Sequence, residues 1–393
     1  MSQRQDFIEL YLQRQCRVSE LCAAFGVSEK TGYKWIARYH EEGRAGLAER
    51  SRAPLSSPHR VAAAVIERIV GLRKRHPTYG ARKLRQILQT ADASVDWPAP
   101  STIFELLKCR GLVRRRRRRR SRGVPWDAAA YGLTPPAAPN DVWAADFKGE
   151  FRLSSGGFCY PLTISDLHSR YVLGCRALSS TASAPTRIVF TRVFREFGLP
   201  RVLRTDNGVP FAQPNALGRL SALTVWWIRL GIRPERITPG APQQNGQHER
   251  MHRTLKDDAT RPPAETLPQQ QRRFDQFRMD YNTVRPHESL EMQPPARHYT
   301  ASARAFPRRL PPLEYPAQRE LRRVGSNGTI AFRAQLFYLT AALAGEDVSL
   351  EETNDAEWTI AFGPLILGIL DERRLLFNPG VCWSSQPSVT STG

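Results

Sequence analysis

The feature that most limits how this chain can fold is a run of seven consecutive arginines in its first third. Neighbouring guanidinium groups repel one another, so the run cannot enter a hydrophobic core and stays extended until an anionic partner neutralises it. The 393-residue chain must therefore fold as separate parts on either side, and residues 114–139 are predicted to form an Arg-rich linker. The run comprises Arg114, Arg115, Arg116, Arg117, Arg118, Arg119 and Arg120.

The distribution of charge indicates a polyanionic partner. The formal net charge is +21, and residues 51–130 alone hold 19 Lys and Arg against 5 Asp and Glu. Cations that neutralise phosphates release condensed counterions, so a basic region of this kind favours nucleic acid. The arginine run is predicted to bind the DNA backbone without reading sequence, although it would also serve as a solvated tether between domains.

Cysteine spacing and hydropathy exclude several classes of protein. The six cysteines show neither a CxxC pair nor a Cys/His ligand spacing, which argues against a structural zinc site and against a disulfide framework. No segment resembles a signal peptide, and none is apolar over the roughly 18 residues that a membrane span requires. We therefore expect a cytoplasmic protein that associates with the nucleoid.

Residues 1–50 are predicted to form a helix-turn-helix DNA-binding domain. Gly26 suits the tight turn after a short helix, and Ser28 suits the N-cap of the next helix, whose Trp35 would face the core. A plain helical hairpin is the alternative, because Gly32 is a poor helix former. The side chains left to reach a DNA major groove are Ser28, Lys30, Tyr33 and Lys34.

Residues 59–113 are predicted to form a second DNA-binding domain, helical or of the winged helix-turn-helix type. A Pro- and Ser-rich segment separates it from the first domain, and helical sequence then runs from Val61 to Arg75. More helical sequence follows, and Ser101 suits the N-cap of a last short helix.

The rest of the chain predicts an α/β domain and a small β domain. Residues 140–297 contain three strand-like runs followed by alternating helices and strands, which is typical of a mixed sheet. Short strands within residues 319–372 predict a small β-barrel, and residues 373–393 are predicted to be a disordered tail. We thus expect a multidomain protein with an N-terminal all-α region, a central α/β domain and a C-terminal small β-barrel.

Three acidic residues occupy positions that indicate metal chemistry. Asp146 lies inside the first predicted strand among apolar neighbours, where a charge is unfavourable without a partner. Asp206 directly follows a short strand, and Glu249 lies on the helix that begins near Gln244. A strand interior, a strand end and a helix can bring three carboxylates to one edge of a mixed sheet. Such a cluster favours two divalent cations, which would clamp the attacking and leaving oxygens of a phosphoryl transfer.

Asp166 is the main alternative carboxylate, because it also lies near a predicted strand. We interpret it as a turn residue that starts the next hairpin. His168 is then a turn or surface histidine rather than a metal ligand.

Six short motifs surround these carboxylates: Asp146-Phe-Lys-Gly149, Ser169-Arg-Tyr171, Thr205-Asp-Asn-Gly208, Gly231-Ile232, Pro242-Gln-Gln-Asn-Gly-Gln-His-Glu-Arg250 and His252-Arg-Thr-Leu-Lys256. In combination they resemble the catalytic core of retroviral integrases and related bacterial insertion-sequence transposases. The resemblance implies an RNase H-like fold in which Asp146, Asp206 and Glu249 are the catalytic metal ligands. It also implies two Mg²⁺ ions, for which Mn²⁺ can substitute, and a DNA contact through Lys256, nearly two helical turns after Glu249.

The spacing of the carboxylates departs from the better-known members of this group. Between Asp206 and Glu249 there are 42 residues, and the extra length falls around Gln213–Leu223. We expect that segment to be a surface excursion that leaves the site intact. A branch of insertion-sequence transposases with this spacing and a helix-turn-helix front end, similar to insertion sequence family 481, resembles the chain from about residue 10 to 370.

These features predict a DNA transposase that cuts and joins strands at the ends of an insertion sequence. Its expected partners are double-stranded DNA, both terminal inverted repeats and target DNA, and further copies of the chain, because two DNA ends must be brought together. One alternative is a sequence-specific DNA-binding regulator with an inactive integrase-like core, and the intact carboxylate set argues against it. Another is a nuclease acting on RNA–DNA hybrids, which would not need a sequence-reading front end.

Overall fold

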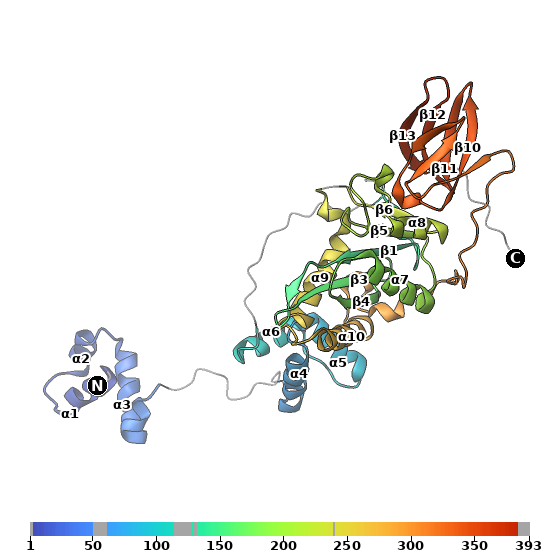
Figure 1. The fold of residues 1–393 in the computed structure, drawn as a ribbon. Helices are drawn as coiled ribbons and strands as arrows, with labels where there is room; N and C mark the ends of the chain where they lie inside the picture. Colours follow the sequence, from blue (N-terminus) through green and yellow to red (C-terminus); the bar gives the residue numbers. More distant parts are fainter. Residues whose placement is uncertain (1–2, 50–60, 114–127, 129–131, 239, 384–393) are drawn as a thin grey trace. The chain divides into compact units, whose positions relative to one another are not determined.

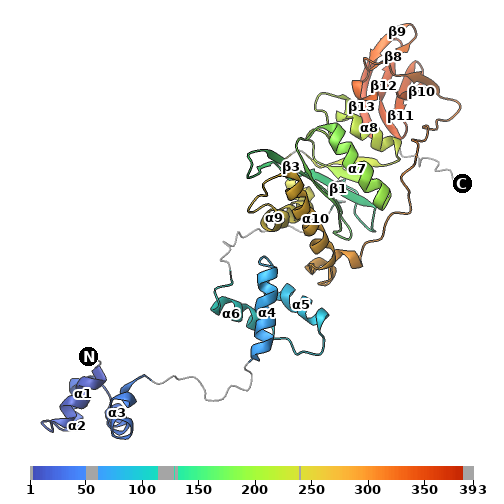
Figure 2. The ribbon, with the colours of Figure 1, turned by 60° about the horizontal axis from the view of Figure 1, so that its bottom comes forward.

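The computed structural model describes residues 3–49, 61–113, 128, 132–238 and 240–383. The chain divides into two compact units, residues 1–62 and 63–393, whose elements are drawn in Figures 1 and 2. No helix in the described parts of the chain is both long enough and apolar enough to cross a lipid bilayer.

The first unit is a small helical domain. Its core joins Phe7, Leu21 and Trp35 from three helices. Gly26 has a φ of +62° in the turn, and the Ser28 hydroxyl accepts a hydrogen bond from the Thr31 amide at 3.3 Å, so the predicted turn and N-cap are confirmed. The elements are α1 Gln3–Leu12, α2 Val18–Ala24, α3 Glu29–Glu42 and the 3-10 helix η1 Gly43–Leu47.

Gly32 is buried where α3 packs against α1 and α2. A β-carbon at this position would lie 2.4 Å from Cys22 Sγ and 3.0 Å from Phe7 Cζ. The helices therefore approach one another at a distance that only glycine permits. Close packing thus accounts for a poor helix former inside α3.

Residues 63–113 form three helices around a core that includes Ile69, Leu84 and Trp97. The helices are α4 Ala63–Arg75, α5 Ala81–Ala91 and α6 Pro100–Cys109. The predicted N-cap at Ser101 is wrong: Ala99 occupies the cap and Pro100 the first helical position, which proline favours because it has no N–H to leave unpaired.

The central domain is a mixed six-stranded sheet, as predicted. The strand order is β2-β3-β1-β5-β6, and β4 pairs with β3. Strand β1 is antiparallel to β3 and parallel to β5, which is parallel to β6. The strands are β1 Val142–Phe147, β2 Phe151–Arg152, β3 Phe158–Asp166, β4 Val172–Leu178, β5 Val202–Thr205 and β6 Arg233–Arg236.

Helices cover both faces of this sheet (Figure 1). Trp143 and Ala145 of β1 belong to a core with α7 Ser183–Phe197 and α8 Ala222–Arg229. The opposite core joins β3 and β4 to α9 Gly246–Ala259 and α10 Leu267–Thr283. Because successive side chains of a strand point to opposite faces, Asp146 lies on the side of α9.

The C-terminal part contains a five-stranded antiparallel sheet, ordered β13-β12-β11-β10-β7, and a separate β8-β9 hairpin. Both contribute to one hydrophobic core. The hydrogen-bonded pairs among the described residues do not form a closed ring, so the closed barrel stays a prediction. The strands are β7 Glu320–Arg323, β8 Thr329–Phe332, β9 Gln335–Tyr338, β10 Asp347–Asn354, β11 Glu357–Phe362, β12 Leu365–Asp371 and β13 Leu376–Trp383.

The prediction of a disordered tail over residues 373–393 is wrong for residues 376–383. These residues form β13, which pairs with β12, and Phe377 and Trp383 pack against the C-terminal core. The Pro379-Gly380 pair interrupts the apolar alternation, so the strand is not recognisable without its partner. Residues 384–393 lie outside the described residues.

The predicted surface excursion at residues 213–223 is only partly on the surface. Gln213 is exposed, but Leu220 is buried in the same core as Val225, Ile228 and the C-terminal strands. An ion pair of 2.6 Å between Arg229 and Glu346 also joins α8 to the C-terminal part. The extra length therefore contributes to the attachment of the C-terminal sheet.

A buried ion pair fixes the edge of the central sheet. Arg204 of β5 is 2% exposed and lies 2.7 Å from Glu235 of β6, which is 8% exposed. Glu235 also accepts hydrogen bonds from the amide and hydroxyl of Thr134, and Arg204 donates one to the Thr134 carbonyl. The segment that leads into the central domain is thereby attached to β5 and β6.

Replacing Glu235 with Gln is expected to lower the free energy of unfolding by about 3–5 kcal/mol, because the Arg204 charge would remain buried without its counterion. Urea denaturation of the full chain measures this. The matched control is Arg201→Gln, which breaks a 3.6 Å pair with Asp141 whose arginine is 76% exposed. The control should change stability by less than about 1 kcal/mol, and equal losses in the two variants would contradict the prediction.

Candidate active site

Two of the three predicted carboxylates lie side by side on neighbouring strands. In the parallel pairing of β1 with β5, Ala145 is opposite Thr205. Asp146 follows Ala145 on β1, and Asp206 directly follows Thr205, the last residue of β5, so the two carboxylates lie at the same edge of the sheet. The Asp206 carboxylate accepts a hydrogen bond of 3.1 Å from the Gly208 amide, which fixes the turn after β5.

The third carboxylate comes from the helix that packs across this edge. Glu249 lies in the first turn of α9 and is exposed. Burial, then the charge of Asp206 and last that of Glu249, raises the pKa of the Asp146 carboxyl. The Asp206 and Glu249 charges therefore both act on Asp146.

Burial dominates the electrostatics of this cluster. Desolvation, followed by the negative charges of Asp206 and Glu249, raises the pKa of Asp146 to about 7. Burial also raises the pKa of Asp206. In the described part of the chain, no lysine or arginine forms an ion pair with any of the three. Carboxylates held close without a counterion suit hard divalent cations, so this donor set fits Mg²⁺ or Mn²⁺.

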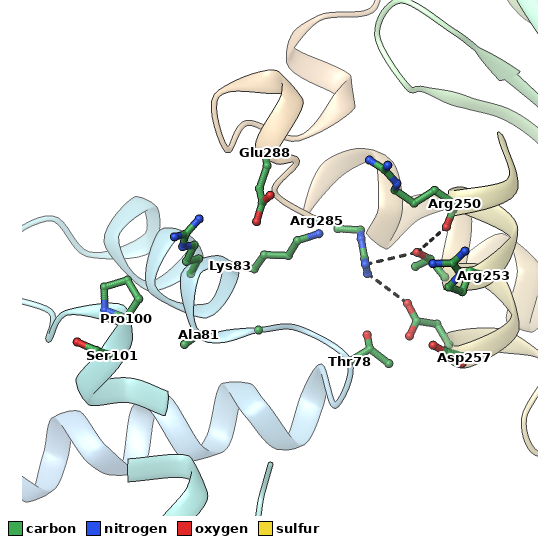
Figure 3. Close-up of a pocket in the computed structure, with 14 residues that line it drawn as sticks. Thr78, Ala81, Lys83, Pro100, Ser101, Arg250, Arg253, Asp257, Arg285 and Glu288 are labelled. Atoms are coloured by element: carbon green, nitrogen blue, oxygen red, sulfur yellow. Dashed lines mark hydrogen bonds and ion pairs between the residues drawn. The ribbon is translucent and has the colours of Figure 1, made fainter. Parts of the chain in front are cut away.

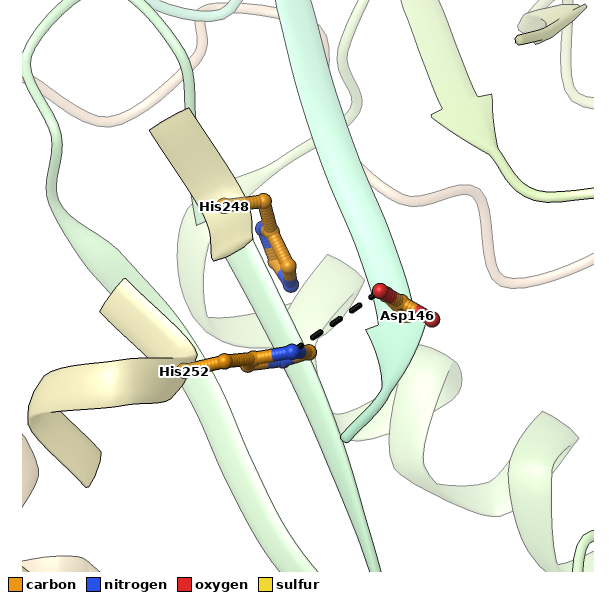
Figure 4. A group of neighbouring side chains, drawn as sticks. All are labelled: Asp146, His248 and His252. Atoms are coloured by element: carbon orange, nitrogen blue, oxygen red, sulfur yellow. Dashed lines mark ion pairs between the residues drawn. The ribbon is translucent and has the colours of Figure 1, made fainter. Parts of the chain in front are cut away.

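Two buried histidines of α9, which were not predicted as site residues, lie next to Asp146 (Figure 4). His252 Nδ1 is 3.8 Å from Asp146 Oδ2, and one ligand atom each of Asp146, His248 and His252 lie within 4.8 Å of one another. Burial lowers the pKa of His248 to about 3 and that of His252 to about 2, so both rings are neutral at pH 7. Their spacing of four residues on a helix was the available signal, because it places both on one face.

Basic side chains flank the carboxylates. Lys148, two residues after Asp146 on the same side of the chain, has a pKa lowered by burial and then by the charges of Lys256 and Arg261. The predicted DNA contact Lys256 is exposed on α9. Lys148 and Arg261 were not predicted as site residues, although Lys148 stands inside one of the quoted motifs.

Asp166 has a structural role, as its interpretation as a turn residue requires. It ends β3 and is fully buried, and it accepts hydrogen bonds from the amide and hydroxyl of Ser169 and from the Asn140 amide. The carboxylate therefore closes the β3–β4 turn and stands apart from the site. His168 is exposed, and its Nδ1 lies 3.1 Å from the Pro136 carbonyl oxygen.

The predicted DNA-contacting residues of the first unit lie on one exposed stretch of chain. Tyr33 is 57% exposed, and the polar atoms of Ser28 are already used by the cap of α3. Lys30 and Lys34 are also exposed. The seven arginines from Arg114 to Arg120 lie outside the described residues.

A cavity of about 650 Å³ lies beside α9, between that helix and helices α5 and α6 (Figure 3). Arg285 contributes to it, with its guanidinium over the Tyr79 ring at 4.9 Å and an ion pair of 3.4 Å to Asp258. The cationic side chains that line the cavity are Arg82, Lys83, Arg250, Arg253 and Arg285. Three carboxylates also line it, so the cavity is not uniformly positive.

Comparison with known protein families agrees with this geometry. Models described as "Integrase core domain" match residues 136–242 and 230–295. A "Helix-turn-helix domain" model matches residues 3–54, and a "Homeodomain-like domain" model matches residues 31–107. The chain therefore contains an N-terminal helix-turn-helix region and a central integrase core domain.

Two of the similar proteins come from bacterial insertion elements. A 39.2 kDa protein of insertion element IS476 from Xanthomonas euvesicatoria is 29% identical over 64% of this chain and 69% of its own length. A 31.7 kDa protein of insertion element IS407 from Burkholderia multivorans is 28% identical over 61% of this chain and 81% of its own length. Among solved structures, the HTLV-2 integrase catalytic core domain in complex with magnesium matches with a TM-score of 0.33 and 14% identity, over 42% of this chain and 99% of that chain.

Asp146→Asn is expected to stabilise the metal-free protein at pH 8. The folded pKa of Asp146 is about 7, and the unfolded value is about 3.9. The Asp146 carboxyl therefore lowers the free energy of unfolding increasingly as pH rises from about 4 to 7, and the full loss is present above pH 7. The full shift corresponds to a gain of at most about 4 kcal/mol. Thermal denaturation in EDTA measures it, and the gain should shrink by pH 5. A variant that is less stable than the parent at pH 8 would contradict the raised pKa.

Proposed function

We propose that this chain is a DNA transposase that cleaves strands at the ends of an insertion sequence and joins them to target DNA. The observation that carries the proposal is the position of Asp146 and Asp206 at one edge of a mixed sheet, with the charge of Glu249 acting on Asp146. The matches to integrase core models and the likeness to proteins of insertion elements support it. Within this class we place the chain near insertion sequence family 481, on the motifs and the longer carboxylate spacing.

The three carboxylates would hold two divalent ions, Mg²⁺ or Mn²⁺. When bound, these ions supply activation of the attacking oxygen and stabilisation of charge on the leaving oxygen. The same site would serve two attacks, first by water on a phosphodiester and then by the freed 3′-hydroxyl on target DNA. The protein's remaining contribution is electrostatic: Lys148 and Lys256 neutralise phosphates next to the carboxylates, which would otherwise repel the DNA.

DNA recognition would be divided among several parts of the chain. Helix α3 would enter a major groove of the terminal inverted repeat through Lys30, Tyr33 and Lys34. The second helical domain would bind a major groove at a separate site on the same DNA. The cationic side chains of the cavity beside α9 and the arginine run would bind backbone phosphates without reading sequence. Bringing two DNA ends together requires more than one copy of the chain on the DNA. The protein would act in the cytoplasm, at the nucleoid.

Glu249→Gln is expected to abolish metal-dependent strand transfer on labelled duplexes that carry the element's terminal repeats, because it removes one anionic metal ligand. The parent chain should give joined products with Mg²⁺ and none with EDTA. Arg201→Gln, at an exposed position away from the carboxylates, is the control and should remain active. Specific DNA binding without cleavage by the parent chain, under either metal, would instead identify a DNA-binding regulator with an inactive core.

Replacing Lys30 and Lys34 together with Ala is expected to weaken binding of the full chain to terminal-repeat DNA. Loss of two phosphate-neutralising charges should reduce the slope of log K against log salt concentration by about 2. Fluorescence anisotropy at several salt concentrations measures the slope, with Arg201→Gln as the reference. An unchanged slope would show that this face of α3 does not contact DNA.

A further inference from the structure

The Thr163 hydroxyl is a hydrogen-bonding centre directly behind Asp146. It lies 3.1 Å from the Asp146 carbonyl oxygen, 2.7 Å from His248 Nε2 and 2.6 Å from His252 Nε2. On the other side of the His248 ring, Nδ1 lies 2.9 Å from the Ser165 hydroxyl. Thr163 and Ser165 are both buried and alternate along β3 with the apolar residues that face α7 and α8.

The number of protons available determines the direction of these hydrogen bonds. A hydroxyl has one proton and accepts through two lone pairs, and a carbonyl only accepts. The Thr163 proton therefore goes to the Asp146 carbonyl, and both Nε2 atoms must donate to Thr163. A neutral imidazole carries one N–H, so both Nδ1 atoms are then lone pairs. The Nδ1 lone pair of His248 accepts a hydrogen bond from the Ser165 hydroxyl. The Nδ1 lone pair of His252 has no donor in this network.

The His252 lone pair thus faces a carboxylate oxygen. His252 Nδ1 and Asp146 Oδ2 are 3.8 Å apart, too far for a hydrogen bond, and Figure 4 shows the ring and the carboxylate facing each other. Two acceptors so placed repel each other unless a proton or a metal ion lies between them, and a metal ion can bind both at once. Metal bonds of about 2.0–2.2 Å to imidazole nitrogen and to carboxylate oxygen fit this separation.

We propose that His252 Nδ1 is a ligand of the same ion that Asp146 holds, so that this metal site contains nitrogen as well as oxygen. The inference rests on the proposed function only in taking Asp146 as a metal ligand. His248, Thr163 and Ser165 fix the tautomer and orientation of His252 without binding the ion themselves. Imidazole suits first-row transition ions, of which Mn²⁺ is the weakest binder, and Mg²⁺ prefers oxygen, so a nitrogen ligand would shift the preference of this site from Mg²⁺ toward Mn²⁺.

Pulsed electron paramagnetic resonance of the full chain loaded with Mn²⁺ tests the ligand directly. A bound histidine nitrogen should modulate the Mn²⁺ echo through its ¹⁴N nucleus, and incorporation of ¹⁵N-histidine should replace that modulation. His252→Gln should remove the modulation and raise the Mn²⁺ dissociation constant at least about tenfold, with a smaller effect on Mg²⁺. His168→Gln, at an exposed turn away from the site, should change neither.

Absence of Mn²⁺ binding, absence of nitrogen modulation in the parent chain, or its persistence in His252→Gln would each overturn the inference. The ¹⁵N-histidine experiment needs no substitution, and His252→Asn serves if the Gln variant does not fold. Failure of strand transfer with intact nitrogen modulation would reject the transposase proposal and leave the metal ligand standing.

Discussion

Parallel pairing of β1 with β5 is the constraint on which the central domain depends. It places Asp146 and Asp206 at the same sheet edge, where their charges repel and burial deprives them of water. The strands cannot separate to relieve this repulsion, because Trp143 and Leu203 are fixed in the core beneath α7 and α8. The fold therefore maintains an unfavourable arrangement of charge, which a divalent cation would convert into a favourable one.

The surroundings of the carboxylates differ in kind on their two sides. Toward the protein interior, Asp146 meets neutral histidines and buried hydroxyls that hydrogen-bond to one another. Lys148, two residues after Asp146, lies close enough to Lys256 and Arg261 for their charges to lower its pKa after burial does. A neutral, fixed interior preserves the metal-binding capacity of the carboxylates, and the outer cations offset their repulsion of a phosphate backbone.

The other parts are attached to the central sheet by one buried ion pair and by one apolar core. Thr134, at the end of the chain entering the domain, is bound by the buried Arg204–Glu235 pair. At the opposite end, Leu220 and Val225 join the core of the C-terminal strands. These contacts connect segments far apart in sequence to the domain that carries the site.

The sequence by itself determined the helix-turn-helix and the mixed sheet and singled out the three carboxylates, because helix caps, strand alternation and acidic residues in apolar runs are local signals. It did not reveal β13, whose Pro379-Gly380 pair hides the strand until β12 lies beside it. It likewise left Gly32 unexplained, since only the crossing of helices excludes a β-carbon there. The role of His252 was decided by tertiary structure alone. Its chemistry depends on Thr163 and Asp146, which are distant in sequence and meet it only when β1, β3 and α9 pack together.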